Sequence, residues 1–139
     1  ADQRGLALLD RARAAEAQGD LKAARRFVTQ AQQSAAEDPF LWYFSAALAI
    51  REGDIPNARV AINRALALAP SDPDILFEAG HVAEAEGDKA RARDYWQKAV
   101  AADPAGPSGI AAKRALAMVD VPLTVTTSAS TPAPATERK

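Results

Sequence analysis

The sequence contains no cysteine and only one histidine, His81. The absence of cysteine excludes disulfides, thiolate metal ligands and cysteine nucleophiles, and it leaves the redox compartment undecided. No zinc-ligand spacing and no glycine-rich phosphate loop occurs. No apolar run approaches the ~18 residues that a membrane span needs. The sequence therefore predicts a soluble chain, of the cytoplasm or of the periplasm and envelope, without a metal or a cofactor.

An excess of charge of one sign is also missing. The 17 basic and 18 acidic residues give a net charge of −1. Such a balance leaves no electrostatic footprint for nucleic acid or for an anionic membrane. No nucleophile beside a base and no pair of carboxylates in a pocket is recognisable, so the sequence predicts no catalytic residue and no enzyme. A lone histidine is more often structural than catalytic.

What the sequence does contain is a repeat with a period of about 34 residues. The dipeptide Gly-Asp occurs in phase at Gly19-Asp20, Gly53-Asp54 and Gly87-Asp88. Asp-Pro occurs at Asp38-Pro39 and again one period later at Asp72-Pro73. Each unit contains two apolar-periodic segments of about 14 residues on either side of Gly-Asp, a pattern typical of a helical hairpin. Aspartates are expected to cap the helices, with proline in a first turn and glycine in a left-handed turn.

The repeat resembles the tetratricopeptide repeat family, which has large, small and aromatic residues at fixed positions of a unit of this length. The family's large residue in the first helix is Leu8, Trp42 and Leu76. Its small residue is Ala12, Ala46 and Gly80, and its bulky residue in the second helix is Val28, Ile62 and Trp96. The family's tyrosine is replaced by Ala15, Ala49 and Ala83. The resemblance implies an all-α fold, a right-handed αα-superhelix whose inner wall is formed mainly by the first helix of each unit.

The chain is expected to form one tetratricopeptide domain over residues 1–119. It would comprise repeats at about 5–38, 39–72 and 73–106 and a capping helix at about 107–119, because a solenoid buries its last hairpin only against a further helix. Residues 120–139 are rich in Thr, Ser, Pro and Ala and have no helical period. They are predicted to form a flexible tail.

Half of the eight aromatic residues lie in one run, "FLWYF", at 40–44. One helical stripe cannot bury all four of these rings, because neighbouring residues point about 100° apart. The resemblance places Trp42 in the core, between the helices of its hairpin. Phe40, Tyr43 and Ala47 follow one face at i, i+3 and i+7, and in the family this line lies on the inner wall. Phe44 either joins this line or packs against the neighbouring unit.

These positions define a predicted peptide-binding groove. It consists of Leu9, Arg13, Phe40, Tyr43, Phe44, Ala47, Ile50, Asp74, Phe77, Glu78, His81 and Glu84. Two alternatives stay open: the aromatic rings could belong to the core, and the acidic residues of the third unit could be a solvated helix face. Some family members bind acidic C-terminal peptides through a clamp of lysine, arginine and asparagine. Asp74, Glu78 and Leu9 stand at clamp positions here, so the resemblance argues against such a clamp.

The sequence thus predicts a non-enzymatic scaffold that binds a peptide segment of a partner protein. That segment is expected to be apolar or aromatic. Whether it also contains basic residues stays open. One alternative is self-association, in which residues 120–139 dock in the groove of the same chain or of a neighbour. Another is a domain of a larger envelope or secretion assembly factor.

Overall fold

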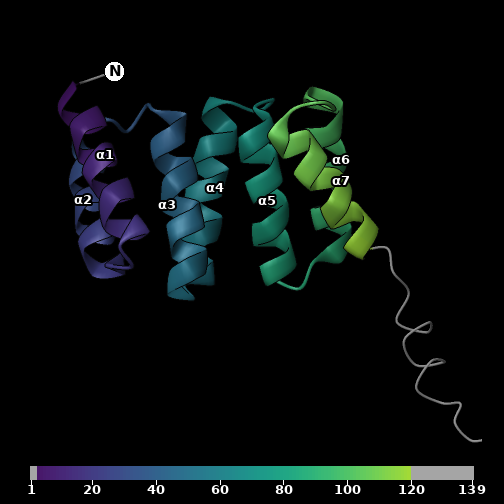
Figure 1. Cartoon of the computed structure of the whole chain (residues 1–139), viewed down its shortest axis with the longest axis horizontal. Helices are drawn as coiled ribbons and strands as arrows, with labels where there is room; N and C mark the ends of the chain where they lie inside the picture. The colour runs from purple at the N-terminus through teal and green to yellow at the C-terminus, as the bar shows by residue number, and fades with distance from the viewer. Residues whose placement is uncertain (1–2, 120–139) are drawn as a thin grey trace, which may run out of the picture.

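The computed structural model describes residues 3–119, and within this range the chain consists of α-helices joined by short turns and contains no strand (Figure 1). Its helices are α1 Gln3–Ala17, α2 Leu21–Ser34, α3 Pro39–Glu52, α4 Ile55–Leu68, α5 Pro73–Ala85, α6 Lys89–Ala102 and α7 Pro107–Val119. They pair into three hairpins, α1–α2, α3–α4 and α5–α6, and α7 follows the third hairpin. Residues 120–139, for which a flexible tail and tail docking were predicted, lie outside the described residues.

The helix boundaries follow from the aspartates and glycines of the repeat. The side chain of Asp38 accepts a hydrogen bond from the backbone N–H of Phe40 at 2.9 Å, and Asp72 accepts from Asp74 and Ile75 in the same way. Such caps satisfy N–H groups that have no partner inside the helix. The second helices are capped by Asp20, Asp54 and Asp88. The glycine before each of these aspartates has a positive φ, between 75° and 85°, where a Cβ is strained. The predicted capping pattern is confirmed.

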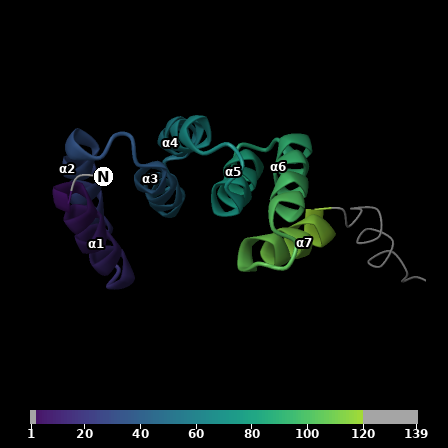
Figure 2. The same ribbon diagram turned by 90° about the horizontal axis from the view of Figure 1, so that it is seen from above.

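The hairpins stand in a row with the helices in two layers (Figure 2). The first helices, α1, α3 and α5, form one layer together with α7, and the second helices α2, α4 and α6 form the other. Seen from above, α1 and α7 extend to the same side of α3 and α5, so the row is concave on that side. We call the concave side of α1, α3, α5 and α7 the inner face.

Three hydrophobic clusters form the core, and each joins one hairpin to the first helix of the next unit. The first cluster includes Leu41 and Leu48 of α3 among residues of α1 and α2. The third includes Trp96 of α6, which is 1% exposed, and Ala112 of α7. Buried alanines in all three clusters let the helices approach closely. Helix α7 therefore covers the third cluster as a first helix would, which is the role predicted for it.

Trp42 differs from the prediction of a buried core residue. It is only half-buried, whereas Leu41 beside it is completely buried. The indole packs against the second cluster, its N–H donates to the Ala36 carbonyl at 2.8 Å, and the Arg64 guanidinium lies 4.7 Å from the ring centre. The smaller leucine at the equivalent position of the next unit, Leu76, is buried. The larger indole extends past this space to the surface, where its polar N–H and its π-face find partners.

Arg25 of α2 joins the first unit to the second. Its guanidinium donates to the Ser45 hydroxyl at 2.9 Å and to the Glu52 carboxylate at 2.6 Å. Ser45 is the one buried polar residue among the described positions, at 3% exposure. One period after Arg25 stands Arg59, which contacts the Glu86 carboxylate at 3.3 Å, and one period after Ser45 stands alanine. The two bridges are thus a matched pair that differs in the buried hydroxyl.

We expect Arg25→Ala to lower the free energy of unfolding by about 1–2 kcal/mol, because Ser45 and its carbonyl lose a charged donor in a dry contact. Arg59→Ala should cost below about 0.5 kcal/mol, since it breaks one exposed ion pair. Urea unfolding followed by far-UV circular dichroism measures both. Equal losses in the two variants would mean that the buried hydroxyl adds nothing to the first bridge.

Candidate peptide-binding face

The predicted site residues occupy α1, α3 and α5, whose layer forms the inner face (Figure 2). Phe40, Arg13, Asp74 and Glu84 are exposed. The half-buried members are Tyr43, Phe44, Ala47, Ile50, Phe77, Glu78 and His81. None of them lines the cavities of about 600 and 450 Å³ in the described part, which lie at residues 33–39 and beside Pro70 and Lys98. The inner face is therefore an open surface with half-buried side chains in its floor.

Leu9 does not belong to this surface, and its prediction as a groove residue is corrected. Its side chain is 4% exposed and packs in the first core cluster with Val28 and Leu41. Its neighbour Leu6 is 43% exposed. Residues of α2 and α3 cover Leu9 in this cluster, so its side chain belongs to the core.

Phe44, which the sequence left unassigned, packs against the first cluster. It thus lies on the side of α3 that faces the preceding unit. One period later stands Glu78, which occupies the corresponding side of α5. This position of the repeat is directed toward the preceding hairpin rather than toward solvent.

The aromatic side chains form two edge-to-face pairs. The rings of Phe40 and Tyr43 lie 6.5 Å apart at 86° on α3, and those of Phe77 and His81 lie 4.6 Å apart at 80° on α5. His81 continues to the buried Trp96 ring at 5.7 Å. Such pairs hold the rings in one orientation before any ligand arrives. Phe40 is 40% exposed and is the most accessible of these rings.

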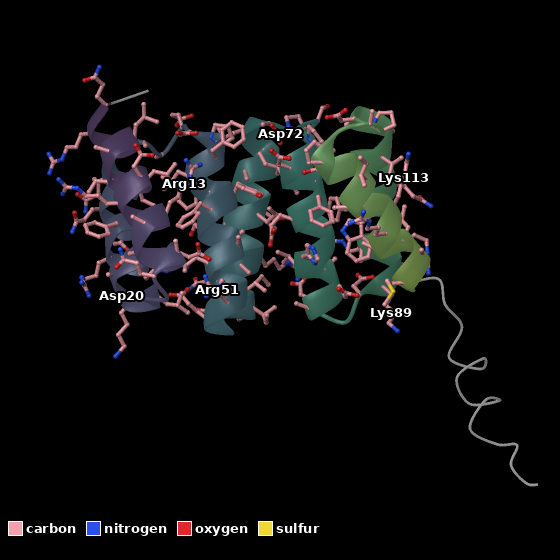
Figure 3. The ribbon with its side chains drawn as sticks, viewed as in Figure 1. Arg13, Asp20, Arg51, Asp72, Lys89 and Lys113 are labelled. Atoms are coloured by element: carbon pink, nitrogen blue, oxygen red, sulfur yellow. The ribbon has the colours of Figure 1, made fainter. Side chains whose placement is uncertain are left out.

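The charges of the inner face differ between its two sides. Arg13 and Arg51 lie between α1 and α3 (Figure 3), and Arg51 is bound to the Glu16 carboxylate. On α5, by contrast, Asp74, Glu78 and Glu84 stand without a lysine or an arginine in the helix. The inner face is thus acidic on its α5 side.

Burial governs the titration of the groups on this acidic side. Desolvation raises the pKa of Glu78 to about 7. Desolvation also raises the pKa of the Tyr43 hydroxyl, with further contributions from the negative charges of Glu78, Asp74 and Asp72 and against the opposing effect of Arg13. Desolvation lowers the pKa of His81, against the opposing effect of Glu84. At neutral pH the floor of the inner face therefore contains neutral aromatic groups and a carboxyl group close to its midpoint of titration.

Two polar contacts of the inner face were missed by the sequence interpretation. Ser108 of α7 donates a hydrogen bond to the Asp74 carboxylate, and Arg51 binds Glu16. The signal for Ser108 was present, because it stands one period after Asp74 and so has the same repeat position on the next first helix. The sequence contained no such signal for Arg51, because the repeat has alanine at the same position one period before it and one period after it.

Comparison with known families shows to which family the chain belongs. The family described as "Cilia and flagella-associated protein 70 middle TPR-like domain" matches residues 8–129. The chain belongs to this family of tetratricopeptide-like domains. The all-α hairpin solenoid predicted from the repeat period is thereby confirmed. No curated protein matches the sequence.

Solved structures of other tetratricopeptide domains share this fold. The first TPR of Spaghetti (RPAP3), bound to the HSP90 peptide SRMEEVD, has a TM-score of 0.80 at 19% identity, over 89% of this chain and 96% of that chain. The Sgt2 TPR domain from Aspergillus fumigatus has a TM-score of 0.78 at 20% identity, over 97% of this chain and 88% of that one. PilW, a type IV pilus biogenesis factor, has a TM-score of 0.79 at 20% identity, over 86% of this chain and 54% of that chain. At these identities the likeness concerns the fold.

Domains of this fold typically serve protein interaction. Over residues 3–119 no group of three or more His, Cys, Asp or Glu side chains is placed to hold a metal ion. No helix in the same range has the length and apolar character to cross a membrane.

Proposed function

We propose that this tetratricopeptide domain is a non-enzymatic interaction scaffold that binds a peptide segment of a partner protein across its inner face. One observation carries the proposal, namely the aromatic pair Phe40–Tyr43, which is partly open to solvent on the concave side and already held edge to face. Exposed aromatic rings in a pre-formed concave surface are typical anchors for a ligand. Phe77 and Ile50 extend the apolar floor.

The affinity of such a site follows from its size. Apolar burial contributes roughly 25 cal/mol per Å², and much of this is offset by the loss of freedom of the peptide. The inner face spans three hairpins and α7, so a bound segment contacts only a few anchors. We expect dissociation constants in the micromolar range, about −8 kcal/mol.

The peptide bound by the neighbouring RPAP3 structure, SRMEEVD, has an acidic end. That neighbour supports peptide binding as a use of this fold. Its ligand type does not transfer to this chain, because Asp74 and Glu78 would repel a terminal carboxylate. The ligand that we propose is therefore a peptide that has apolar anchors and lacks an acidic C-terminal motif.

Phe40→Ala is expected to weaken peptide binding about tenfold, because it removes the most accessible anchor ring. The probe is an array of acetylated, amidated octapeptides with one phenylalanine or leucine fixed and the adjacent positions occupied by Lys, Arg, Met, Gln or Glu. Dissociation constants of the best peptides follow from fluorescence anisotropy. Phe40 is a better probe than Tyr43 or Phe77, because those rings are half-buried against the core and their loss also lowers stability.

The matched control is Val60→Ala, which truncates a side chain that is 61% exposed on α4, in the other layer of helices. This variant should bind the same peptides with unchanged affinity. The proposal is wrong if Val60→Ala and Phe40→Ala weaken binding equally, or if no peptide binds the wild-type domain.

A further inference from the structure

Glu78 lies where α5 packs against α3, in the floor of the inner face. Its repeat position is that of Phe44, which packs against the preceding unit. Its charge acts on the Tyr43 hydroxyl of α3, which places the two side chains near each other. A carboxylate thus occupies the repeat position at which the preceding unit has a half-buried phenylalanine.

Three other glutamates join neighbouring units, and each of them has a cationic partner. Glu52 is bound to Arg25, Glu86 to Arg59, and Glu16 to Arg51. Glu78 is half-buried, and it has no hydrogen-bond donor and no cation in contact within residues 3–119. Its neighbour Asp74 accepts from Ser108. Within the described residues, Glu78 is therefore a half-buried carboxylate of the inner face that the fold leaves without a partner.

A half-buried carboxylate without a partner is unfavourable in its charged form, and desolvation raises the pKa of Glu78 to about 7. A cation supplied by a ligand would remove this penalty and restore the charged form. The surroundings suit a cation in two further ways. Asp74 and Glu84 add negative charge on the same helix, and the faces of Tyr43 and Phe40 attract cations. Lys113, the lysine of α7, lies at the outer edge of that helix (Figure 3). The cation whose charge acts on Tyr43 is Arg13 of α1.

We propose that the peptide bound on the inner face presents a lysine or arginine side chain to Glu78, next to an apolar or aromatic residue that packs on Phe40 and Tyr43. This inference rests on the proposed function, and it names the chemistry of the ligand. The basic side chain pairs with the carboxylate between α3 and α5, and its aliphatic stem packs against the neighbouring rings. A methionine at the same place has the stem and lacks the charge.

The test uses the best lysine-containing octapeptide of the array and two versions of it, with methionine or glutamate in place of the lysine. We expect the wild-type domain to bind the lysine peptide about tenfold more tightly than the methionine peptide, and the glutamate peptide most weakly. Glu78→Gln should bind the lysine and methionine peptides with similar affinity. Asp94→Asn is the matched control, because it removes one negative charge from α6. It should keep the lysine preference.

Each other outcome overturns the inference. If wild type binds the lysine and methionine peptides equally, Glu78 is not a cation site, and the effect of Phe40→Ala still decides the proposed function separately. If Asp94→Asn loses the lysine preference as Glu78→Gln does, the preference reflects net charge alone. If no peptide of the array binds the wild-type domain, the inference and the proposed function fail together.

Discussion

Replacing Gly80 with alanine is expected to destabilise the domain by about 2–3 kcal/mol, although glycine to alanine in a helix interior normally stabilises by up to about 1 kcal/mol. Gly80 lies in the middle of α5, directly against the indole of Trp96 in α6. A Cβ built at Gly80 would overlap with Nε1, Cδ1 and Cε2 of that ring. Because the expected change in stability has the opposite sign to the usual one, this substitution tests the direct packing of Gly80 on Trp96.

The ring has little freedom to move away from a new methyl group. Trp96 is 1% exposed, and its N–H donates to the Phe77 carbonyl at 3.1 Å. A shift of the indole would break this hydrogen bond and disturb the third core cluster. The strain therefore remains in the hairpin and appears as lost stability.

The repeat itself supplies the compensating change. At the two corresponding positions the second unit has Ala46 and Ile62, and the first unit has Ala12 and Val28, all buried. In the first two units, alanine in the first helix is thus paired with an aliphatic residue in the second helix. In the third unit, glycine is paired with tryptophan. We expect Trp96→Ile alone to cost about 2–4 kcal/mol through the cavity that it leaves. The double variant G80A/W96I should be more stable than the sum of the two losses predicts.

Urea unfolding of wild type, both single variants and the double variant forms a complete double-mutant cycle. A coupling of at least about 1 kcal/mol in the favourable direction is expected. Additive losses, or a Gly80→Ala variant that is more stable than wild type, would contradict the direct packing of the glycine on the indole.

Glu78→Gln is expected to stabilise the domain at neutral and alkaline pH and to have no effect in acid. The folded-state pKa of Glu78 is raised to about 7 from the ordinary 4.5 by burial. Below pH 4.5 the carboxyl group is protonated in both states and costs nothing. As the pH rises toward 7 the unfolded chain releases this proton and the folded chain keeps it, so stability is lost across that window.

Above pH 7 the penalty is complete, and the neutral glutamine removes it. Each unit of pKa shift corresponds to about 1.4 kcal/mol, and after allowance for the exposed part of the side chain we expect a gain of about 2 kcal/mol at pH 8. The pKa of the neighbouring Tyr43 is raised above its ordinary value of 10.0, so this hydroxyl stays neutral from pH 4 to pH 8 and adds no titration to the difference.

The measurement is the difference in unfolding free energy between Glu78→Gln and wild type at pH 4, 6 and 8. Glu84→Gln is the control, because it removes the same charge from an exposed position of the same helix. It should change stability by less than about 0.5 kcal/mol at each pH. A gain for Glu78→Gln that is the same at pH 4 and pH 8 would exclude titration of the carboxyl group as its cause.

Much of the candidate site was accessible from the sequence because the repeat fixes which positions share a face. The i, i+3, i+7 line on α3 and its counterpart on α5 selected Phe40, Tyr43 and Phe77. The same spacing failed for Leu9, which residues of α2 and α3 cover in the first core cluster. It also gave no warning that Glu78, in contrast to Glu52 and Glu86, has no cation in contact among the described residues.

The sequence by itself determined where each helix begins and ends, because capping and left-handed glycine are local interactions. The aspartate side chain reaches N–H groups two or three residues away, and Gly53 needs only its own φ. Repetition of these signals once per period then determined the hairpin solenoid. No contact between distant parts of the chain is needed to read either feature.

Only the tertiary structure decided which aromatic rings are covered. Burial depends on what the neighbouring helices place opposite each side chain: glycine opposite Trp96 admits a whole indole, whereas Trp42 exceeds the space in its own hairpin and keeps an exposed edge. The pKa of Glu78 has the same origin, because its shift comes from desolvation in the folded chain. The volume and polarity opposite a side chain are properties of the assembled row of helices, and a local pattern does not contain them.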